Sequence, residues 1–317
     1  MPPVPGERLA SLDLGSHTAR MLIAERVEGP ERFRTLARER AYIRLADGAG
    51  PEQDIAAGAI DQTLRALRHF SRVARKNGVK RIHGVATGIM RGAANRDSLL
   101  DLIYRETGIR VRVITGEEEA ALTSTGVLHS LDRGERPYGI FDLGGATTEF
   151  IAGGGQASFA VSLPLGAMTL TREFLHSDPP LDRELNALTG RVDAILAGNI
   201  SGRISLNRGE AVLVGTGGTV TTLGVMIHGI PHREITPERM NGLILGRRAV
   251  ETLFTRMKGM PTGERARLQG LDEGRADVIV AGTLVVLRIM HILGSSQITV
   301  SMSDILEGIL IEVLMPS

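Results

Sequence analysis

The stretch DLGSHTAR at residues 13–20 decides the fold, because a second version of it, DLGGATTE, occupies residues 142–149. Apolar runs flank each version, which predicts two strands joined by a tight, glycine-containing turn. The two aspartates, Asp13 and Asp142, lie 129 residues apart (142 − 13). Further strand and helix patterns follow in the same order in both halves. We therefore expect an α/β protein of two similar domains that face one another across a central cleft. Chance similarity is the alternative, since strand–Asp–Gly turns are common.

The composition narrows the class of protein. The 317 residues are 42% hydrophobic and 23% charged, which is typical of a folded globular chain. The formal net charge is only +1, so any site for an anion has to be local, and we expect neither nucleic acid nor a membrane as a partner. The absence of cysteine excludes disulfides, thiolate metal sites and cysteine nucleophiles. The most apolar stretch, residues 278–293, is too short to cross a bilayer and contains Arg288. It predicts a buried helix in a soluble, cytoplasmic protein.

The first turn carries groups that suit phosphate and metal. Expected strands at residues 9–12 and 20–27 flank it. The hydroxyls of Ser16 and Thr18, with the backbone N–H groups of the turn, can donate to an anion. Asp13, at the end of a strand, can hold a divalent cation through water. The alternative is an ordinary hairpin whose Asp and Ser bond their own backbone.

The second turn repeats this design with two acids. Asp142 and Glu149 can place carboxylate oxygens on magnesium, while Gly144, Gly145 and Thr147 face phosphate. The alternative is a hairpin whose glutamate is a solvated strand residue.

Two further segments follow expected strands. GTGGT at residues 215–219 opens a helix, so Gly217 and Gly218 are candidates for an anion or nucleotide site; close packing of helix on strand is the alternative. Thr87 and Arg91 stand after another strand, where a guanidinium can bind phosphate in a bidentate manner. Solvation at a helix start explains Arg91 equally well.

The acidic triplet in GEEEA, residues 116–120, stands where a strand gives way to a helix. Acids in the first helical turn complement the helix dipole, which explains two of the three. Hydrolysis of a phosphate chain needs one carboxylate directed at water, and this triplet is the best candidate in the chain.

Taken together, these segments resemble the Ppx/GppA phosphatases, the exopolyphosphatases and guanosine pentaphosphate phosphohydrolases of the actin-like superfold. The resemblance covers nearly the whole chain. It runs through DLGSHTAR, LADG (45–48), VATGIMRGAANRD (85–97), ITGEEEA (114–120), FDLGGATTEF (141–150), SLPLGAMTLTREF (162–174), VGTGGTVTTL (214–223), RADVIVAGTLVV (275–286) and EGIL (307–310).

The resemblance implies two actin-like (ribonuclease H-like) domains around an interdomain cleft. The first would comprise residues 1–127 with a returning C-terminal helix at residues 303–317. The second would comprise residues 128–302.

The resemblance also implies site roles. Glu119 would be the carboxylate that activates water for attack on a terminal phosphorus. Asp142 and Glu149 match the magnesium-associated acids of the family, and Asp13 belongs to its first phosphate loop. The expected phosphate-binding residues are Ser16, His17, Thr18, Thr87, Arg91, Gly144, Gly145, Thr147, Gly217 and Gly218.

The expected function is therefore magnesium-dependent hydrolysis of the terminal phosphate of inorganic polyphosphate, with lower processivity or a preference for short chains. A homodimer is the candidate assembly. Removal of the 5′-phosphate of guanosine pentaphosphate (pppGpp) is the first alternative. An ATP-dependent kinase of the same superfold is a second. A non-catalytic binder of polyphosphate or alarmone is a third, because His17, Ala146 and Leu306 depart from the pattern of the family.

Overall fold

The computed structural model describes residues 6–29, 31–47, 54–131, 136–154, 159–200 and 211–314. The chain divides into two compact units, Met1–Gly126 with Asp304–Ser317, and Val127–Ser303. Helix α3 (Gly116–Ser130) runs from the first unit into the second. Residues 1–5 and 315–317 of the expected first domain, and Gly48 of the LADG motif, lie outside the described residues.

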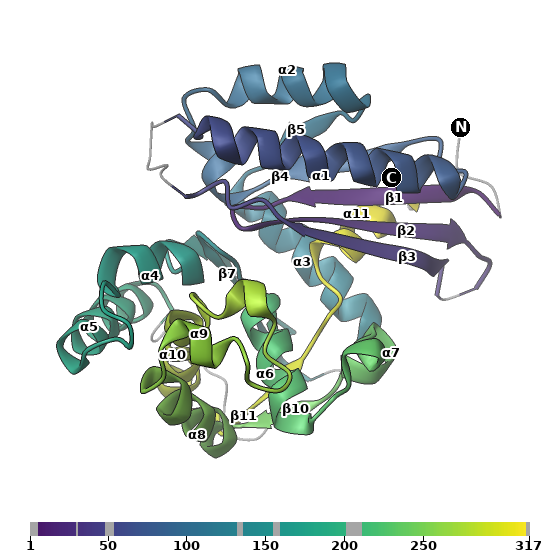
Figure 1. Ribbon diagram of the computed structural model, residues 1–317. Helices are drawn as coiled ribbons and strands as arrows, with labels where there is room; N and C mark the ends of the chain where they lie inside the picture. The colour runs from purple at the N-terminus through teal and green to yellow at the C-terminus, as the bar shows by residue number, and fades with distance from the viewer. Residues whose placement is uncertain are drawn as a thin grey trace. The chain divides into compact units, whose positions relative to one another are not determined.

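The first unit is a five-stranded sheet with helices on both faces (Figure 1). Its elements are β1 (Arg8–Leu14), β2 (Thr18–Arg26), β3 (Phe33–Tyr42), α1 (Ala57–Lys76), β4 (Ile82–Ala86), the 3-10 turn η1 (Gly88–Arg91), α2 (Arg96–Thr107), β5 (Val111–Val113), the first part of α3, and α11 (Ile305–Leu314). The strand order is β3-β2-β1-β4-β5, and β2 runs antiparallel to the other four.

Strand β2 shows why both faces are covered. Successive side chains of a strand point to opposite faces, so an apolar run buries both. Met21 and Ile23 join the core under α1 and α2, whereas Leu22 and Ala24 pack against α11. The C-terminal helix α11 thus belongs to the first unit, where it covers the face of the sheet opposite to α1 and α2.

The second unit is built on a six-stranded sheet in the order β10-β11-β9-β6-β7-β8. Its elements are β6 (Tyr138–Leu143), β7 (Thr148–Gly153), β8 (Phe159–Leu163), α4 (Ala167–Phe174), α5 (Asp182–Asn199), β9 (Val212–Thr216), α6 (Gly218–His228), η2 (His232–Glu234), α7 (Pro237–Met240), β10 (Ile244–Gly246), α8 (Arg247–Lys258), α9 (Thr262–Arg265), η3 (Glu273–Arg275), α10 (Ile279–Ile292) and β11 (Gln297–Val300).

The two sheets share one topology. In each, an antiparallel three-stranded meander, β1-β2-β3 or β6-β7-β8, is extended on the side of its first strand by two parallel strands, β4-β5 or β9-β11. Strand β10 is an antiparallel addition at the edge of the second sheet. This is the actin-like arrangement twice over, and the prediction of two related α/β domains is confirmed.

Helix α10 accounts for the most apolar stretch of the sequence. It lies at the centre of the second unit, where it packs against α4, α5, α6 and α8 and buries ten of its residues. A helix that is apolar all round is a core helix in a globular protein, as predicted. In the part of the chain that the structure describes, no helix has the length and apolarity needed to cross a membrane.

Candidate active site

The two repeated turns have the same backbone geometry. The amide of Gly15 donates to the carbonyl of Thr18 at 3.0 Å, and the amide of Gly144 donates to the carbonyl of Thr147 at 3.0 Å. A Cβ added at either glycine would lie 3.1 Å from that carbonyl oxygen, which is tighter than an ordinary contact. Each glycine therefore permits a turn that a side chain would crowd.

In the first turn, Asp13 and Arg20 face each other across the β1–β2 ladder. Arg20 donates to one carboxylate oxygen of Asp13 through Nε (3.1 Å) and Nη2 (2.6 Å), while the Thr87 hydroxyl lies 3.4 Å from the other. Burial raises the pKa of Asp13; the Arg20 charge and the hydrogen bonds lower it, and the nearby Asp304 raises it. The candidate metal ligand of this turn is thus already engaged by a guanidinium.

Arg20 also ties this turn to the C-terminal helix. Its Nη1 pairs with Asp304, the residue before α11, and Asp304 accepts a hydrogen bond from the amide of Leu306 (3.1 Å). Glu307 closes a capping box by accepting from the Asp304 amide (2.9 Å), and its other oxygen pairs with Arg38 of β3. Two arginines of the sheet therefore hold the buried start of α11.

A chain of contacts leads from the first turn to the acidic triplet. The buried Ser16 hydroxyl accepts a hydrogen bond from the amide of Ile89 at 2.9 Å, which fixes η1 beside the turn. Arg91, at the end of η1, donates from Nη1 to Oε2 of Glu119 at 2.5 Å. The structure thus brings Asp13, Ser16, Thr87, Arg91 and Glu119 together in one region of the first unit.

The three acids of the triplet have different surroundings. Thr115 and Glu118 form a capping box at the start of α3, with hydrogen bonds of 2.8 and 3.1 Å, and Glu118 also pairs with Arg112. Hydrogen bonds from the backbone and from Thr115 lower the pKa of Glu117, and hydrogen bonds from the Thr115 backbone and from Arg112 lower the pKa of Glu118. Glu119 alone is buried, with 7% of its surface exposed. The geometry separates one enclosed carboxylate from two that serve the helix start.

His17 and Thr18 occupy structural positions beside the turn. The ring of His17 is buried and meets Tyr42 edge-on, with ring centroids 5.2 Å apart. Thr18 opens β2 opposite Tyr42 and supplies the carbonyl that closes the turn. Their expected contact with phosphate stays a prediction.

In the second unit, the pairing register places four polar residues in a row across neighbouring strands. Ser162, Glu149, Asp142 and Thr216 are successive partners on β8, β7, β6 and β9, so their side chains share one face. Ser162 donates to Oε1 of Glu149 at 2.7 Å. The buried Thr216 hydroxyl has no hydrogen-bond partner among the described residues. Two buried carboxylates and an orphaned hydroxyl suit a hard cation that keeps most of its water, which is how Mg²⁺ binds.

The glycines of the second turn meet helix α4. The carbonyl of Gly144 accepts from the amide of Ala167, and that of Gly145 accepts from Met168 and Thr169, at 2.9 to 3.1 Å. Among the described residues only Arg32 and Arg44 combine a side chain with a positive φ, so Ala146 needs no left-handed backbone. This departure from the family pattern therefore introduces no strain of that kind.

The glycines of the GTGGT turn are explained from the sequence either by an anion site or by close packing, and the structure shows close packing at both Gly217 and Gly218. Gly217 has a φ of +90° and a Cβ there would lie 2.8 Å from Oδ1 of Asp142, so only glycine fits beside this carboxylate. A Cβ at Gly218 would collide with the guanidinium of Arg275, which therefore lies at the N-terminus of α6. Close approach is thus one reason for the glycines, and the group that approaches Gly218 is a cation.

The comparison with known sequences decides the family. The sequence profile of the Ppx/GppA phosphatase family matches residues 22–316. The chain belongs to this family. Exopolyphosphatase 2 of Mycobacterium tuberculosis is 31% identical over 313 residues, which cover 95% of this chain and 97% of that protein. Exopolyphosphatase 1 of Mycobacterium leprae is 28% identical and covers 97% and 89%.

Solved structures agree. The crystal structure of an exopolyphosphatase from Cytophaga hutchinsonii superposes with a TM-score of 0.88 at 26% identity, covering 97% of this chain and 98% of that one. The Ppx/GppA family member of Aquifex aeolicus gives a TM-score of 0.78 at 28% identity, covering 96% and 97%. The expected family and fold are confirmed, and so is the expectation that the chain is a phosphoanhydride hydrolase. The cytoplasmic location stays a prediction.

Sequence reasoning did not select three residues that lie within these clusters. Arg20 and Arg275 are cations beside a candidate phosphate turn, and Thr216 carries the orphaned hydroxyl. A signal existed for Arg20, which ends the quoted DLGSHTAR, and for Thr216 within GTGGT. Arg275 likewise opens the quoted RADVIVAGTLVV, but no local signal linked it to the glycine turn, because Gly218 lies 57 residues earlier (275 − 218).

Proposed function

We propose that this protein hydrolyses the terminal phosphate of inorganic polyphosphate, with Glu119 as the general base that activates water. The enclosure of Glu119 is the observation that carries the proposal. It is the one buried acid of its triplet, and Arg91 fixes its position beside the turn of Asp13 and Ser16. A carboxylate fixed next to a phosphate site is placed to take a proton from attacking water.

Arg91 serves both partners of the reaction in this proposal. A guanidinium has five N–H donors in a rigid fork, so one side chain can hold a carboxylate and contact a phosphate. The contact with Glu119 uses Nη1. Arg91 would thus keep the base and the terminal phosphate in a fixed relation.

Asp142 and Glu149 would hold Mg²⁺, which supplies positive charge to the phosphate oxygens when it is bound. Their buried, directly opposed carboxylates and the orphaned hydroxyl of Thr216 support this assignment. Asp13 fits the role less well, because Arg20 already engages one of its oxygens. Its proposed part is to orient Arg20 at the first turn.

The first test is release of phosphate from long-chain polyphosphate, tripolyphosphate and guanosine pentaphosphate, compared with and without magnesium. We expect release from polyphosphate that depends on magnesium. Faster turnover of the nucleotide would favour pppGpp hydrolysis. Binding without release would favour a non-catalytic binder, and phosphate transfer from ATP to an acceptor would favour a kinase.

The second test is Glu119→Gln, which removes the base but keeps size and polarity. We expect turnover to fall by about 10²-fold or more while substrate binding persists. Glu117→Gln is the matched control, since it changes an exposed neighbour of the same triplet, and its turnover should equal that of the wild type. Near-normal turnover in Glu119→Gln would disprove the assignment of the base.

A further inference from the structure

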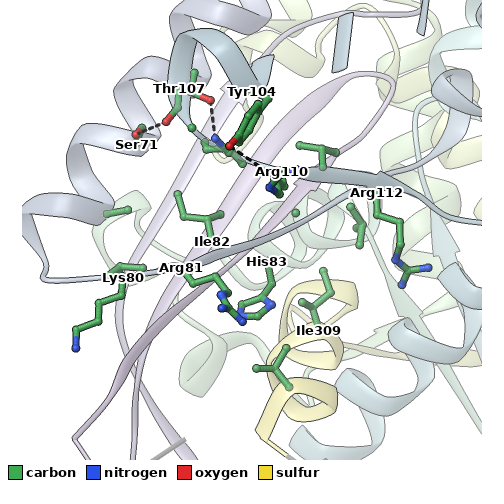
Figure 2. Close-up of a pocket in the computed structure, with 18 of the residues that line it drawn as sticks. Ser71, Lys80, Arg81, Ile82, His83, Tyr104, Thr107, Arg110, Arg112 and Ile309 are labelled. Carbon is green, nitrogen blue, oxygen red and sulfur yellow. Dashed lines mark hydrogen bonds between the residues drawn. The ribbon is translucent and has the colours of Figure 1, made fainter. Parts of the chain in front are cut away.

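A basic groove lies where β4 and β5 begin, at the end of the first sheet opposite to the turn of Asp13. Its volume is about 1190 Å³. Five lysine and arginine side chains line it: Arg112, which pairs with Glu118, and Arg75, Lys80, Arg81 and Arg110, which define the basic groove here. Figure 2 shows Lys80 and Arg81 on the segment that leads into β4, with Arg110 on the segment that leads into β5.

The charges of the basic groove are poorly compensated. The side chains of Arg75, Lys80 and Arg81 form no hydrogen bond or ion pair with any described residue. Arg110 bonds only the neutral hydroxyl of Tyr104, at 3.0 Å. Glu312 is the one acid among the described residues that line the groove. Since the whole chain carries a net charge of only +1, this excess of cations is local.

His83 lies in the same groove, and burial is the main cause of its lowered pKa. It lies half-buried in the groove beside Arg81 (Figure 2). Burial lowers the pKa of His83, the Arg81 charge lowers it further, and Glu7 raises it. Of the four cations, Arg81 thus contributes to the shift of the His83 pKa, and burial contributes more.

One further cation of the groove, Arg112, lies along the edge of the sheet toward the candidate active site, where it pairs with Glu118. Strand β5 is an edge strand and runs parallel to β4, with Arg112 beside Val85. Thr87 lies two residues after Val85, just beyond the end of β4. From Arg81 to Thr87 there are six residues of extended chain, or roughly 20 Å. A polyanion that reached from the groove to Thr87 would have to be longer than tripolyphosphate.

The groove suits an inorganic polyanion better than a nucleic acid. Proteins that hold single strands stack bases on exposed aromatic rings. Tyr104 is the one exposed aromatic side chain of the groove, and the guanidinium of Arg110 lies 4.2 Å from its ring centroid, over the face that a base would need.

We propose that the basic groove is a second polyphosphate site, which holds the distal part of a long chain while its terminus lies at the candidate active site. This inference rests on the proposed function and assigns its site a preference for long chains, in contrast to the short-chain preference expected from the sequence. The enzyme would keep its hold on a long chain between successive cleavages.

The test variant combines Arg75→Gln, Lys80→Gln and Arg81→Gln, none of which touches the candidate active site. We expect kcat/KM for long-chain polyphosphate to fall at least about tenfold at low salt, and kcat/KM for tripolyphosphate to stay unchanged. In the wild type, added salt should raise KM for the long chain more steeply than for tripolyphosphate, because screening acts on more contacts. This salt titration tests the groove even where the variant folds poorly.

The matched control combines Arg183→Gln, Arg191→Gln and Arg256→Gln in the second unit. These three arginines are exposed on α5 and α8, and their side chains form no bond with a described residue. The control removes the same net charge, so both of its kcat/KM values should match those of the wild type.

Three outcomes would overturn the inference: equal loss in variant and control, no loss in the variant, or tighter binding of a single-stranded oligonucleotide than of polyphosphate. The proposed function fails separately. If the wild type releases no phosphate from either chain, titration calorimetry with long-chain polyphosphate still shows whether the basic groove binds it, as a difference between variant and control.

Discussion

Two glycines with contrasting surroundings allow a quantitative test of how the C-terminal helix seats. Gly308 lies in α11 against α3, where a Cβ would overlap the backbone carbonyl of Leu122. The reverse contact is equally close, since a Cβ at Gly126 of α3 would overlap the carbonyl of Asp304. Backbone meets backbone at both points, so no rotation of a side chain can relieve the overlap. Gly308→Ala should therefore force the two helices apart.

The magnitude follows from two opposing effects. Overpacking of this kind costs about 3 kcal/mol, at the upper end of the usual range, because only helix displacement relieves it. Alanine regains about 1 kcal/mol of helix propensity over glycine. The free energy of unfolding of the first unit should fall by about 2 kcal/mol, which lowers the Tm of a unit of this size by roughly 5–8 °C.

Gly190→Ala is the matched control, because it makes the same change inside helix α5. A Cβ at Gly190 meets no heavy atom within 4 Å, so the variant should be more stable than the wild type by up to about 1 kcal/mol. Scanning calorimetry and urea unfolding measure both variants. If Gly308→Ala were as stable as Gly190→Ala, the close packing of α11 on α3 would be refuted.

Two further predictions concern the ends of helices. Thr115→Ala removes the capping box at the start of α3 and should lower the free energy of unfolding by about 1 kcal/mol in urea, whereas Thr115→Ser, which keeps the hydroxyl, should restore most of it. Burial raises the pKa of Glu307 above its ordinary 4.5, so the folded state binds this proton more tightly than the unfolded state does. That contribution is complete below about pH 4.5 and is lost as the pH rises through the folded pKa. The free energy of unfolding of the wild type minus that of Glu307→Gln should therefore be more positive at about pH 4 than at pH 7. A value that becomes more positive as the pH rises would contradict this reasoning.

The sequence predicted most of the fold because its signals are local. Apolar runs, helical periods and the repeated Asp-Leu-Gly turn are all read within a few residues. The end of β1 was harder to predict. The apolar run suggested a strand ending at Leu12, yet β1 continues to Leu14. The reason is the pairing of Asp13 with Arg20 across the ladder, which adds ion-pair contacts that apolarity does not report.

The contacts that complete the first turn could not be read from sequence at all. Arg20 and Asp304 are 284 residues apart, and Arg38 and Glu307 are 269 apart. Nothing in the local pattern of α11 indicates which strand it covers. Likewise, the triplet at the start of α3 contains three equivalent letters, and only the packing shows that Glu118 caps the helix while Glu119 is enclosed beside Arg91.

The repeat itself explains how two like turns acquire different chemistry. Counting seven residues from the aspartate reaches Arg20 in the first copy and Glu149 in the second, and each lies directly opposite its aspartate on the neighbouring strand. The shared backbone makes this one position decide the sign of the local charge. An arginine there neutralises the aspartate and leaves a site suited to phosphate; a glutamate doubles the negative charge and leaves a site suited to a cation. In the proposed function, one substitution at an equivalent register therefore distinguishes the candidate phosphate turn from the candidate magnesium site, while the backbone of the turn is the same in both.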